Sequence, residues 1–156
     1  MIYMGLDLAT KRTGYSVFND NDLIHFGTID SPEELHIRDR IKYMGKKIIE
    51  IIKDYNPIIV FIEDVPIVTI NKKMTSALSW LCILQGYIIS ILDNSNIEYR
   101  LYMPSTWRTD LNLVVQPKID AKKDTIKYVN DKFNLELRYH SNDIKSDDNT
   151  ADAIGI

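Results

Sequence analysis

The chain has 156 residues, of which 45% are hydrophobic and 26% charged, so it is long enough for one compact domain with a core and too short for two. We therefore expect a single domain over residues 1–156. The net charge of −3, from 19 Lys and Arg against 22 Asp and Glu, argues by itself against a nucleic-acid binder, because attraction to phosphate needs cations.

No stretch combines a basic start, an apolar core and a small-residue cleavage site, so we expect no secretory signal. Cys82 is the single cysteine and has no internal disulfide partner, and its apolar neighbours predict a buried thiol. Both features favour a reducing cytoplasm. Residues 74–92 carry no charge and approach membrane-spanning length, but they include polar side chains such as Gln85, so we expect a buried helix and no membrane partner.

Three short strands are predicted at the start of the chain. Residues 2–6 form an apolar run, and residues 13–18 and 23–29 alternate between apolar and polar side chains. The turn-like residues 19–22 separate the last two runs. We therefore expect an antiparallel three-strand meander.

A helix signature follows this meander. Ser31 is a candidate N-cap, with proline and glutamate at the first and third helical positions, and apolar residues then recur on one side to about Tyr55. Asn56-Pro57 ends this predicted helix. Residues 58–62 form a continuous β-branched and aromatic run, typical of a strand covered on both faces.

The second half of the chain alternates predicted helices and strands, as in α/β folds. Residues 74–94 are apolar nearly all round a helix, so we expect one face to pack on the sheet and another on a partner chain. The other predicted elements are a strand at 99–103, a short helix from Pro104, an amphipathic helix at 119–133 and a last helix at 149–156.

Two acidic residues stand at the ends of predicted strands. Asp7 directly follows residues 2–6, and Glu63 ends the run 58–62. An isolated buried carboxylate is very costly, so Glu63 must be paired or bind a metal. Pairing with a lysine is the structural alternative for Glu63, as turn capping is for Asp7. Active sites in α/β sheets favour such strand ends.

A third acidic group lies near the C-terminus. Asp148 or Asn149 shares a helical face with Asp152, because residues three or four apart point to the same side. Helix capping is the alternative for the first two. Together with Asp7 and Glu63, and without a Cys/His cluster, these oxygen ligands indicate Mg²⁺, with Mn²⁺ as a substitute, and not zinc. Two such ions clamp the attacking and leaving oxygens in phosphodiester hydrolysis.

Five short motifs occur in register along the chain: Gly5-Leu6-Asp7, Thr13-Gly14-Tyr15, Ile62-Glu63, Pro104 through Trp107-Arg108, and Ala151-Asp152-Ala153. Their order and spacing resemble those of the RuvC-like Holliday junction resolvases over essentially the whole chain. The resemblance implies an α/β, RNase H-like fold with helices flanking a mixed central sheet. It also implies a Mg²⁺-dependent endonuclease that resolves Holliday junctions and other branched DNA by paired nicks. Phage members, which act in the host cytoplasm, are the most similar kind.

Family members dimerise through the helix that corresponds to residues 74–94, so the resemblance implies a homodimer with its two sites on opposite strands. The interface candidates on this helix are Trp80, Leu84, Tyr87, Ile88 and Ile91. The alternative is that this helix is only core.

Asp7, Glu63 and Asp152 match three of the family's four metal-binding acids, but the fourth position falls on Asn149. An amide oxygen can coordinate metal, but it carries no charge and cannot act as a base. Three explanations stay open: Asp148 substitutes through a one-residue shift, Asn149 is an engineered replacement that traps an inactive form, or the native enzyme tolerates a weaker site. We favour the engineered replacement, so we expect impaired catalysis that Asn149→Asp would restore.

Two further departures concern the loops beside the acids. Leu8-Ala9 stands where the family usually has Pro-Gly, and alanine lacks the freedom of glycine to take positive φ. In bacterial members the loop beyond Glu63 places an aromatic wedge against the junction, whereas Pro66 aligns here. Ile67 or Ile70 could insert between base steps instead. We therefore expect a broader range of branched substrates.

The resemblance also assigns roles to cations. Lys123 aligns with a family lysine in the catalytic site, and Arg108 with one near the scissile phosphate. An ordinary solvated charge is the alternative for both. Side chains expected to contact DNA phosphates are Lys72, Lys73, Arg108, Lys118 and Lys122.

Three other functions compete with this interpretation. One is another RNase H-like nuclease that acts on RNA, and a second is a protein that binds branched DNA without efficient cleavage, which Asn149 favours. The third, an actin-like nucleotide-binding fold, ranks last because the chain lacks the glycine pattern for phosphate binding.

Overall fold

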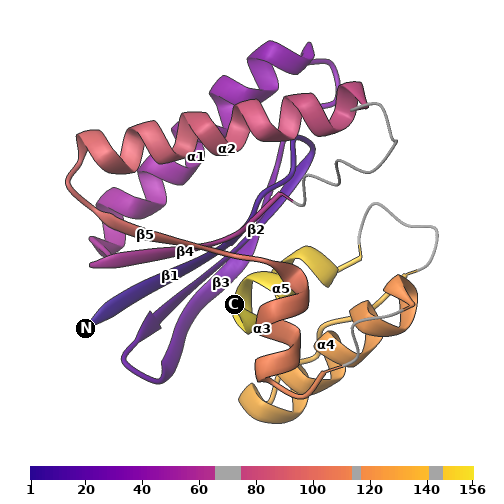
Figure 1. Ribbon diagram of the computed structural model, residues 1–156. Coiled ribbons are helices and arrows are strands. Elements are labelled where there is room, and N and C mark those ends of the chain that lie inside the picture. The colour runs from indigo at the N-terminus through magenta and orange to yellow at the C-terminus, as the bar shows by residue number, and fades with distance from the viewer. Residues whose placement is uncertain (66–74, 114–116, 141–145) are drawn as a thin grey trace.

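A mixed five-stranded sheet separates two helical layers in the computed structural model, which describes residues 1–65, 75–113, 117–140 and 146–156 (Figure 1). The strand order is β3-β2-β1-β4-β5. The predicted antiparallel meander is formed by β1 (Ile2–Asp7), β2 (Arg12–Asn19) and β3 (Asp22–Asp30), and β4 (Ile59–Glu63) and β5 (Glu98–Tyr102) continue the sheet parallel to β1. The expected mixed sheet flanked by helices is therefore confirmed.

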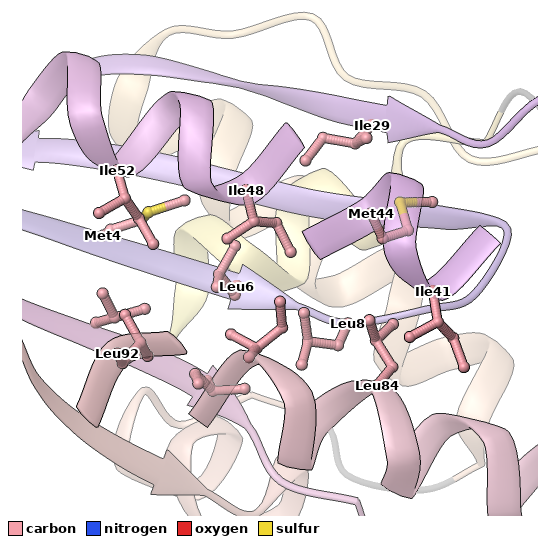
Figure 2. Close-up of a cluster of buried hydrophobic side chains, with 13 residues drawn as sticks. Met4, Leu6, Leu8, Ile29, Ile41, Met44, Ile48, Ile52, Leu84 and Leu92 are labelled. Carbon is pink, nitrogen blue, oxygen red and sulfur yellow. The ribbon is translucent and has the colours of Figure 1, made fainter. Parts of the chain in front are cut away.

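Helices α1 (Ile37–Tyr55) and α2 (Ser76–Asn94) cover one face of this sheet (Figure 1). The alternation of β1 sends Met4 and Leu6 into the core between this face and the two helices (Figure 2). The helices fill this core with fully or nearly fully buried apolar side chains: Ile41, Met44, Ile48 and Ile52 from α1, and Leu84, Ile88 and Leu92 from α2.

The start of α1 differs from the sequence prediction. Ser31 was expected to cap a helix, but α1 begins six residues later at Ile37, with His36 as its N-cap. Ser31 instead extends the pairing of the meander, because its N–H donates to Lys11 O at 2.9 Å and its hydroxyl lies 3.3 Å from Thr10 O. A serine used in this way is not available to cap a helix.

The outer side of α2 remains exposed in the chain. Ile83 is 50% and Tyr87 40% exposed, and Cys82, predicted to be buried, is only partly so. By length and composition alone α2 could cross a membrane. Its inner face nevertheless belongs to the core, since Leu84 and Ile88 are completely buried there. Those two interface candidates are therefore core residues.

The opposite face of the sheet carries α3 (Pro104–Asp110), α4 (Lys118–Phe133) and α5 (Asp148–Gly155) (Figure 1). The backbone of helix α5 packs unusually close to the backbone of β1 and β2. A Cβ atom on Gly5 would overlap Ala153 O, and the Ser16 hydroxyl donates to that same carbonyl at 2.6 Å. The small side chains of β1 and β2 therefore determine how closely α5 approaches the sheet.

Candidate metal centre at the strand ends

Asp7 and Glu63 end two neighbouring parallel strands. β1 and β4 pair through Leu6 and Ile62, so the next residue of each strand emerges at the same edge of the sheet. Because Leu6 and Ile62 point into the core beneath α1 and α2, the two acids turn toward the opposite face, where α5 lies. The sequence predicted that each acid ends a strand, and the pairing of β1 with β4 brings those ends together.

The Asp7 carboxyl group lies in an acidic environment. Burial raises its pKa well above the usual value, and the negative charges of Glu63 and Asp152 raise it further. The positive charges of Lys122 and Arg108 lower this pKa and partly oppose the increase. Carboxylates from β1, β4 and α5 therefore act on one another at this edge.

Asp152 is almost completely buried where α5 meets the strands, at 5% exposure. Its Oδ1 forms an ion pair of 2.8 Å with Arg108 Nη2. Arg108 was expected to contact DNA, but it is only 8% exposed and stacks on Trp107, with Cζ 4.3 Å from the ring centroid. Helix α3 thus directs this guanidinium inward, where it neutralises an expected metal ligand.

Trp107 holds the other strand-end acid. Its indole Nε1 donates a hydrogen bond of 3.1 Å to Glu63 Oε2, and the ring, which is 3% exposed, packs against Gly155 of α5. Sequence reasoning used Trp107 only as part of a motif and missed this role. A buried tryptophan needs an acceptor for its N–H, and that requirement is the signal that could have identified the contact.

The two candidates for the fourth ligand point in different directions. Asp148 is 7% exposed, and its Oδ2 forms an ion pair with Lys122 Nζ, whose charge also acts on Asp7. Asn149 instead uses its Nδ2 to donate to the backbone carbonyl of Arg12, at the start of β2. The structure therefore links Asp148 to the strand-end acids through Lys122 and gives Asn149 a bond that anchors α5.

Among the predicted basic residues, the structure places Lys122 and not Lys123 against the acids. Lys123 is exposed on α4 and lies over the Tyr139 ring, 5.7 Å from its centroid. Successive helical residues differ in direction by about 100°, so only one of the two lysines can face α5. The side chain of Lys118 and five other predicted residues lie outside the described part of the chain: Pro66, Ile67, Ile70, Lys72 and Lys73.

The loop after Asp7 is held without the proline and glycine that the family usually has there. The fully buried Thr13 hydroxyl donates to Ala9 O at 2.8 Å and accepts from Ala9 N at 3.1 Å. Ala9 is not among the described residues with positive φ. This conformation therefore needs no glycine, and the departure from the family pattern has a local solution.

The donors fit a hard divalent cation by type, since Asp7, Glu63, Asp148 and Asp152 offer carboxylate oxygens. Burial and, after it, the charges of Glu63 and Asp152 raise the pKa of Asp7, and a bound cation would relieve the repulsion among these carboxylates. As they stand, no three His, Cys, Asp or Glu side chains in the described part of the chain are grouped to hold an ion. Arg108 and Lys122 engage the two acids of α5 instead.

Comparison with known proteins places the chain among nucleases. No protein-family model matches it. It is 29% identical over 160 residues to the crossover junction endodeoxyribonuclease RuvC of Dictyoglomus thermophilum, which covers 100% of this chain and 93% of the relative. It is 30% identical over 133 residues to the crossover junction endodeoxyribonuclease RuvC of Prosthecochloris aestuarii, covering 83% of this chain and 67% of the relative.

Solved structures give the same fold. Thermus thermophilus RuvC in complex with a Holliday junction substrate matches with a TM-score of 0.73 at 14% identity, over 100% of this chain and 89% of that chain. The yeast mitochondrial Holliday junction resolvase Ydc2 matches with a TM-score of 0.60 at 14% identity, over 99% of this chain and 75% of that chain. Likeness at such low identity shows the fold alone, and it confirms the RNase H-like fold expected from the sequence.

Proposed function

This chain belongs to the RuvC family of crossover junction endodeoxyribonucleases, and from that premise we propose that it resolves Holliday junctions by paired cuts in opposing strands. The observation that carries this proposal is that Asp7 and Glu63 end the paired strands β1 and β4, near enough to Asp152 of α5 for its charge to act on Asp7. The family implies a nuclease that depends on divalent metal. Its relatives are named endodeoxyribonucleases, and that name favours DNA over RNA as the substrate.

The metals we propose are two Mg²⁺ ions, with Mn²⁺ as a substitute, held by Asp7, Glu63, Asp148 and Asp152. Four carboxylates balance the charge of two divalent cations, and hard oxygen donors suit both metals. Divalent cations in such sites activate water and stabilise the charge of the reacting phosphate. The protein holds the ligands, since Trp107 orients the Glu63 carboxylate and the buried ion pair with Arg108 fixes Asp152.

Asp148 is the better candidate for the fourth ligand. Its carboxylate lies beside Lys122, which also acts on Asp7, whereas Asn149 donates to the Arg12 carbonyl. An aspartate at position 149 could not make that donation. Of the three explanations for Asn149, the geometry therefore favours a one-residue shift to Asp148 over an engineered replacement. Lys122 would have to leave Asp148 when a cation binds there, and its ammonium group could then contact a DNA phosphate.

We further propose that the enzyme works as a homodimer through α2. A four-way junction has two opposed strands to cut, and two copies of the chain supply two sites. The support is the exposed apolar face of α2, with Ile83 50% and Tyr87 40% exposed. Branched DNA is the proposed partner of this dimer. The single, unpaired Cys82 suits a reducing cytoplasm.

A second candidate function is binding of branched DNA without efficient cleavage. The observation that favours it is that Arg108 and Lys122 already neutralise the two acids of α5. These two basic side chains would compete with metal ions for the carboxylates. The resulting surface would bind DNA phosphates but cut the strands slowly.

Both candidates are tested with a synthetic four-way junction labelled on each strand in turn. The proposed function predicts paired nicks in Mg²⁺ or Mn²⁺, none in EDTA, little cutting of a linear duplex of the same sequence, and loss of cutting in Asp7→Asn. Junction binding without nicks in either metal would support the second candidate and overturn the first. Preferential cutting of a matched RNA junction would overturn both.

A further inference from the structure

Gln85 is a buried polar residue in the middle of the apolar helix α2. It is 8% exposed and lies next to the fully buried core residue Leu84. A primary amide inside a core is unfavourable unless its donors and acceptor are satisfied. The contacts of Gln85 therefore explain why an apolar helix can carry a glutamine on its inner side.

Both ends of the Gln85 amide bind the chain immediately after Glu63. Its Oε1 accepts from the Val65 N–H at 3.1 Å, and its Nε2 donates to Asp64 Oδ1 at 2.9 Å. The Asp64 N–H in turn donates to Tyr102 O at 2.9 Å, which continues the pairing of β4 with β5 one residue beyond Glu63. Val65 is itself 7% exposed, so its N–H has no access to bulk water as an alternative partner.

This contact fixes the two described residues that follow β4. The regular ladder with β5 ends at Glu63, and the next two described residues, Asp64 and Val65, are held by single hydrogen bonds to the Tyr102 carbonyl and the Gln85 amide. The Gln85 amide fixes the two residues that follow, and Trp107 Nε1 fixes the Glu63 carboxylate itself at 3.1 Å. A metal ligand is effective only when held close to its productive geometry, and its supporting residues supply that constraint.

We propose that Gln85 is a positioning residue for Glu63: through Asp64 and Val65 it fixes the end of β4 and so holds the Glu63 carboxylate for metal binding and strand cleavage. The proposal rests on the proposed function for its cleavage readout. It assigns α2 a second role, because the helix with the exposed apolar face also supports the centre on the other side of the sheet. The competing explanation is that these hydrogen bonds only satisfy the buried Gln85 amide and stabilise the packing of α2.

Two variants separate positioning from packing. Gln85→Met keeps the approximate volume of the side chain and removes both hydrogen bonds. Gln85→Glu keeps an acceptor for the Val65 N–H but sets a carboxylate against Asp64. Adding Asp64→Asn to Gln85→Glu restores the pair with its polarity reversed, because the new amide donates to the new carboxylate. The matched control is Ile48→Val, which removes one methyl group from the α1 side of the core and leaves the hydrogen bonds of Gln85 to Asp64 and Val65 intact.

The readouts are single-turnover cleavage of the four-way junction, junction affinity without divalent metal, and the Tm increase produced by Mg²⁺. Gln85→Met should cleave about 10- to 100-fold more slowly and show a smaller Mg²⁺-induced Tm increase, with junction affinity within about twofold of the wild type. Gln85→Glu should show the same defects, and the double variant should recover most of the lost rate. Ile48→Val should cleave like the wild type.

Wild-type cleavage and a wild-type Mg²⁺ response in Gln85→Met would overturn the proposal, as would a double variant no better than Gln85→Glu alone. Equal loss of rate in Ile48→Val would show that lowered stability explains the defect and would also overturn it. If the wild-type protein does not cut junctions, the proposed function fails. The Mg²⁺-induced Tm increase then decides on Gln85, since that measurement needs no cleavage.

Discussion

Gly14 of β2 lies directly against the backbone of Asn149 at the start of α5, so close that a Cβ atom on Gly14 would overlap the Asn149 carbonyl group. Position 14 pairs with Asp7 across the β1–β2 ladder. The same close approach therefore places Asp148 and Asp152 of α5 beside the strand that carries Asp7.

Replacing Gly14 should damage both the fold and the site. Gly14→Ala forces α5 away from β2, and we expect a loss of about 1–3 kcal/mol in the free energy of unfolding from overpacking. Cleavage should fall further than stability explains, because the acids of α5 move with the helix. Urea denaturation and single-turnover cleavage measure the two effects.

Gly86→Ala is the matched control for Gly14→Ala. A Cβ on Gly86 has nothing within 4 Å, and the residue lies in the middle of α2, so alanine should increase stability by about 0.5–1 kcal/mol. Equal destabilisation by both changes would contradict the close approach of α5 to β2.

Trp107→Phe tests the orientation of Glu63. Phenylalanine keeps an aromatic ring beneath Arg108 and against Gly155 but removes the N–H that reaches Glu63 Oε2. We expect roughly tenfold slower cleavage from the loss of a supporting hydrogen bond, with a stability change of only about 1 kcal/mol. The Mg²⁺ dependence of cleavage should shift to higher concentration. A variant with the cleavage rate and Mg²⁺ dependence of the wild type would show that Glu63 needs no such support.

Exchanging the two residues at the start of α5 tests the identity of the fourth ligand. Asp148→Asn should reduce cleavage by more than the roughly tenfold loss expected for a supporting residue, because it removes a ligand charge. Asn149→Asp should not increase the rate, and it should cost about 1 kcal/mol of stability by losing the hydrogen bond to Arg12 O. Faster cleavage in Asn149→Asp would restore the interpretation that an aspartate is missing at that position.

Lys122→Met and Lys123→Met should have different effects although the residues are adjacent. Removing Lys122 frees the Asp148 carboxylate, so the half-saturating Mg²⁺ concentration should decrease. Lys123 is exposed, and its loss should only weaken junction binding and lower the salt-dependence slope by about 0.9. Cleavage titrated with Mg²⁺ and binding titrated with salt distinguish them. A lower half-saturating Mg²⁺ concentration in Lys123→Met, with only a lower salt-dependence slope in Lys122→Met, would contradict the geometry.

Ile83→Asp tests the proposed dimer. A charge on the exposed face of α2 should convert the protein to monomers in light scattering and leave the free energy of unfolding of the chain almost unchanged, since Ile83 is 50% exposed. Ile24→Asp, at a residue of β3 that is 46% exposed, is the control and should stay dimeric. A wild-type protein that is monomeric at micromolar concentration would refute the dimer.

Most elements could be predicted because their signals are local. The apolar run of β1, the alternation in β2 and β3, the proline at the start of α3 and the apolar periodicity of α4 each act within a few residues. The start of α1 could not, because Ser31 is used by the distant backbone of Thr10 and Lys11. A capping pattern in the sequence does not reveal a competing partner in the loop between β1 and β2.

The sequence by itself determined that Asp7 and Glu63 each end a strand, because an apolar run shows which residue follows it, whereas the tertiary structure made those two strands neighbours. Only the tertiary structure decided the contacts around them: Asp148 pairs with Lys122, Asn149 binds the Arg12 carbonyl, Trp107 donates to Glu63, and Gln85 binds Asp64. Adjacent residues on a helix point about 100° apart, so the selected side chain depends on how the helix docks. Helix α5 docks where Gly5, Gly14 and Ser16 let its backbone approach, and that close contact joins residues far apart in the chain.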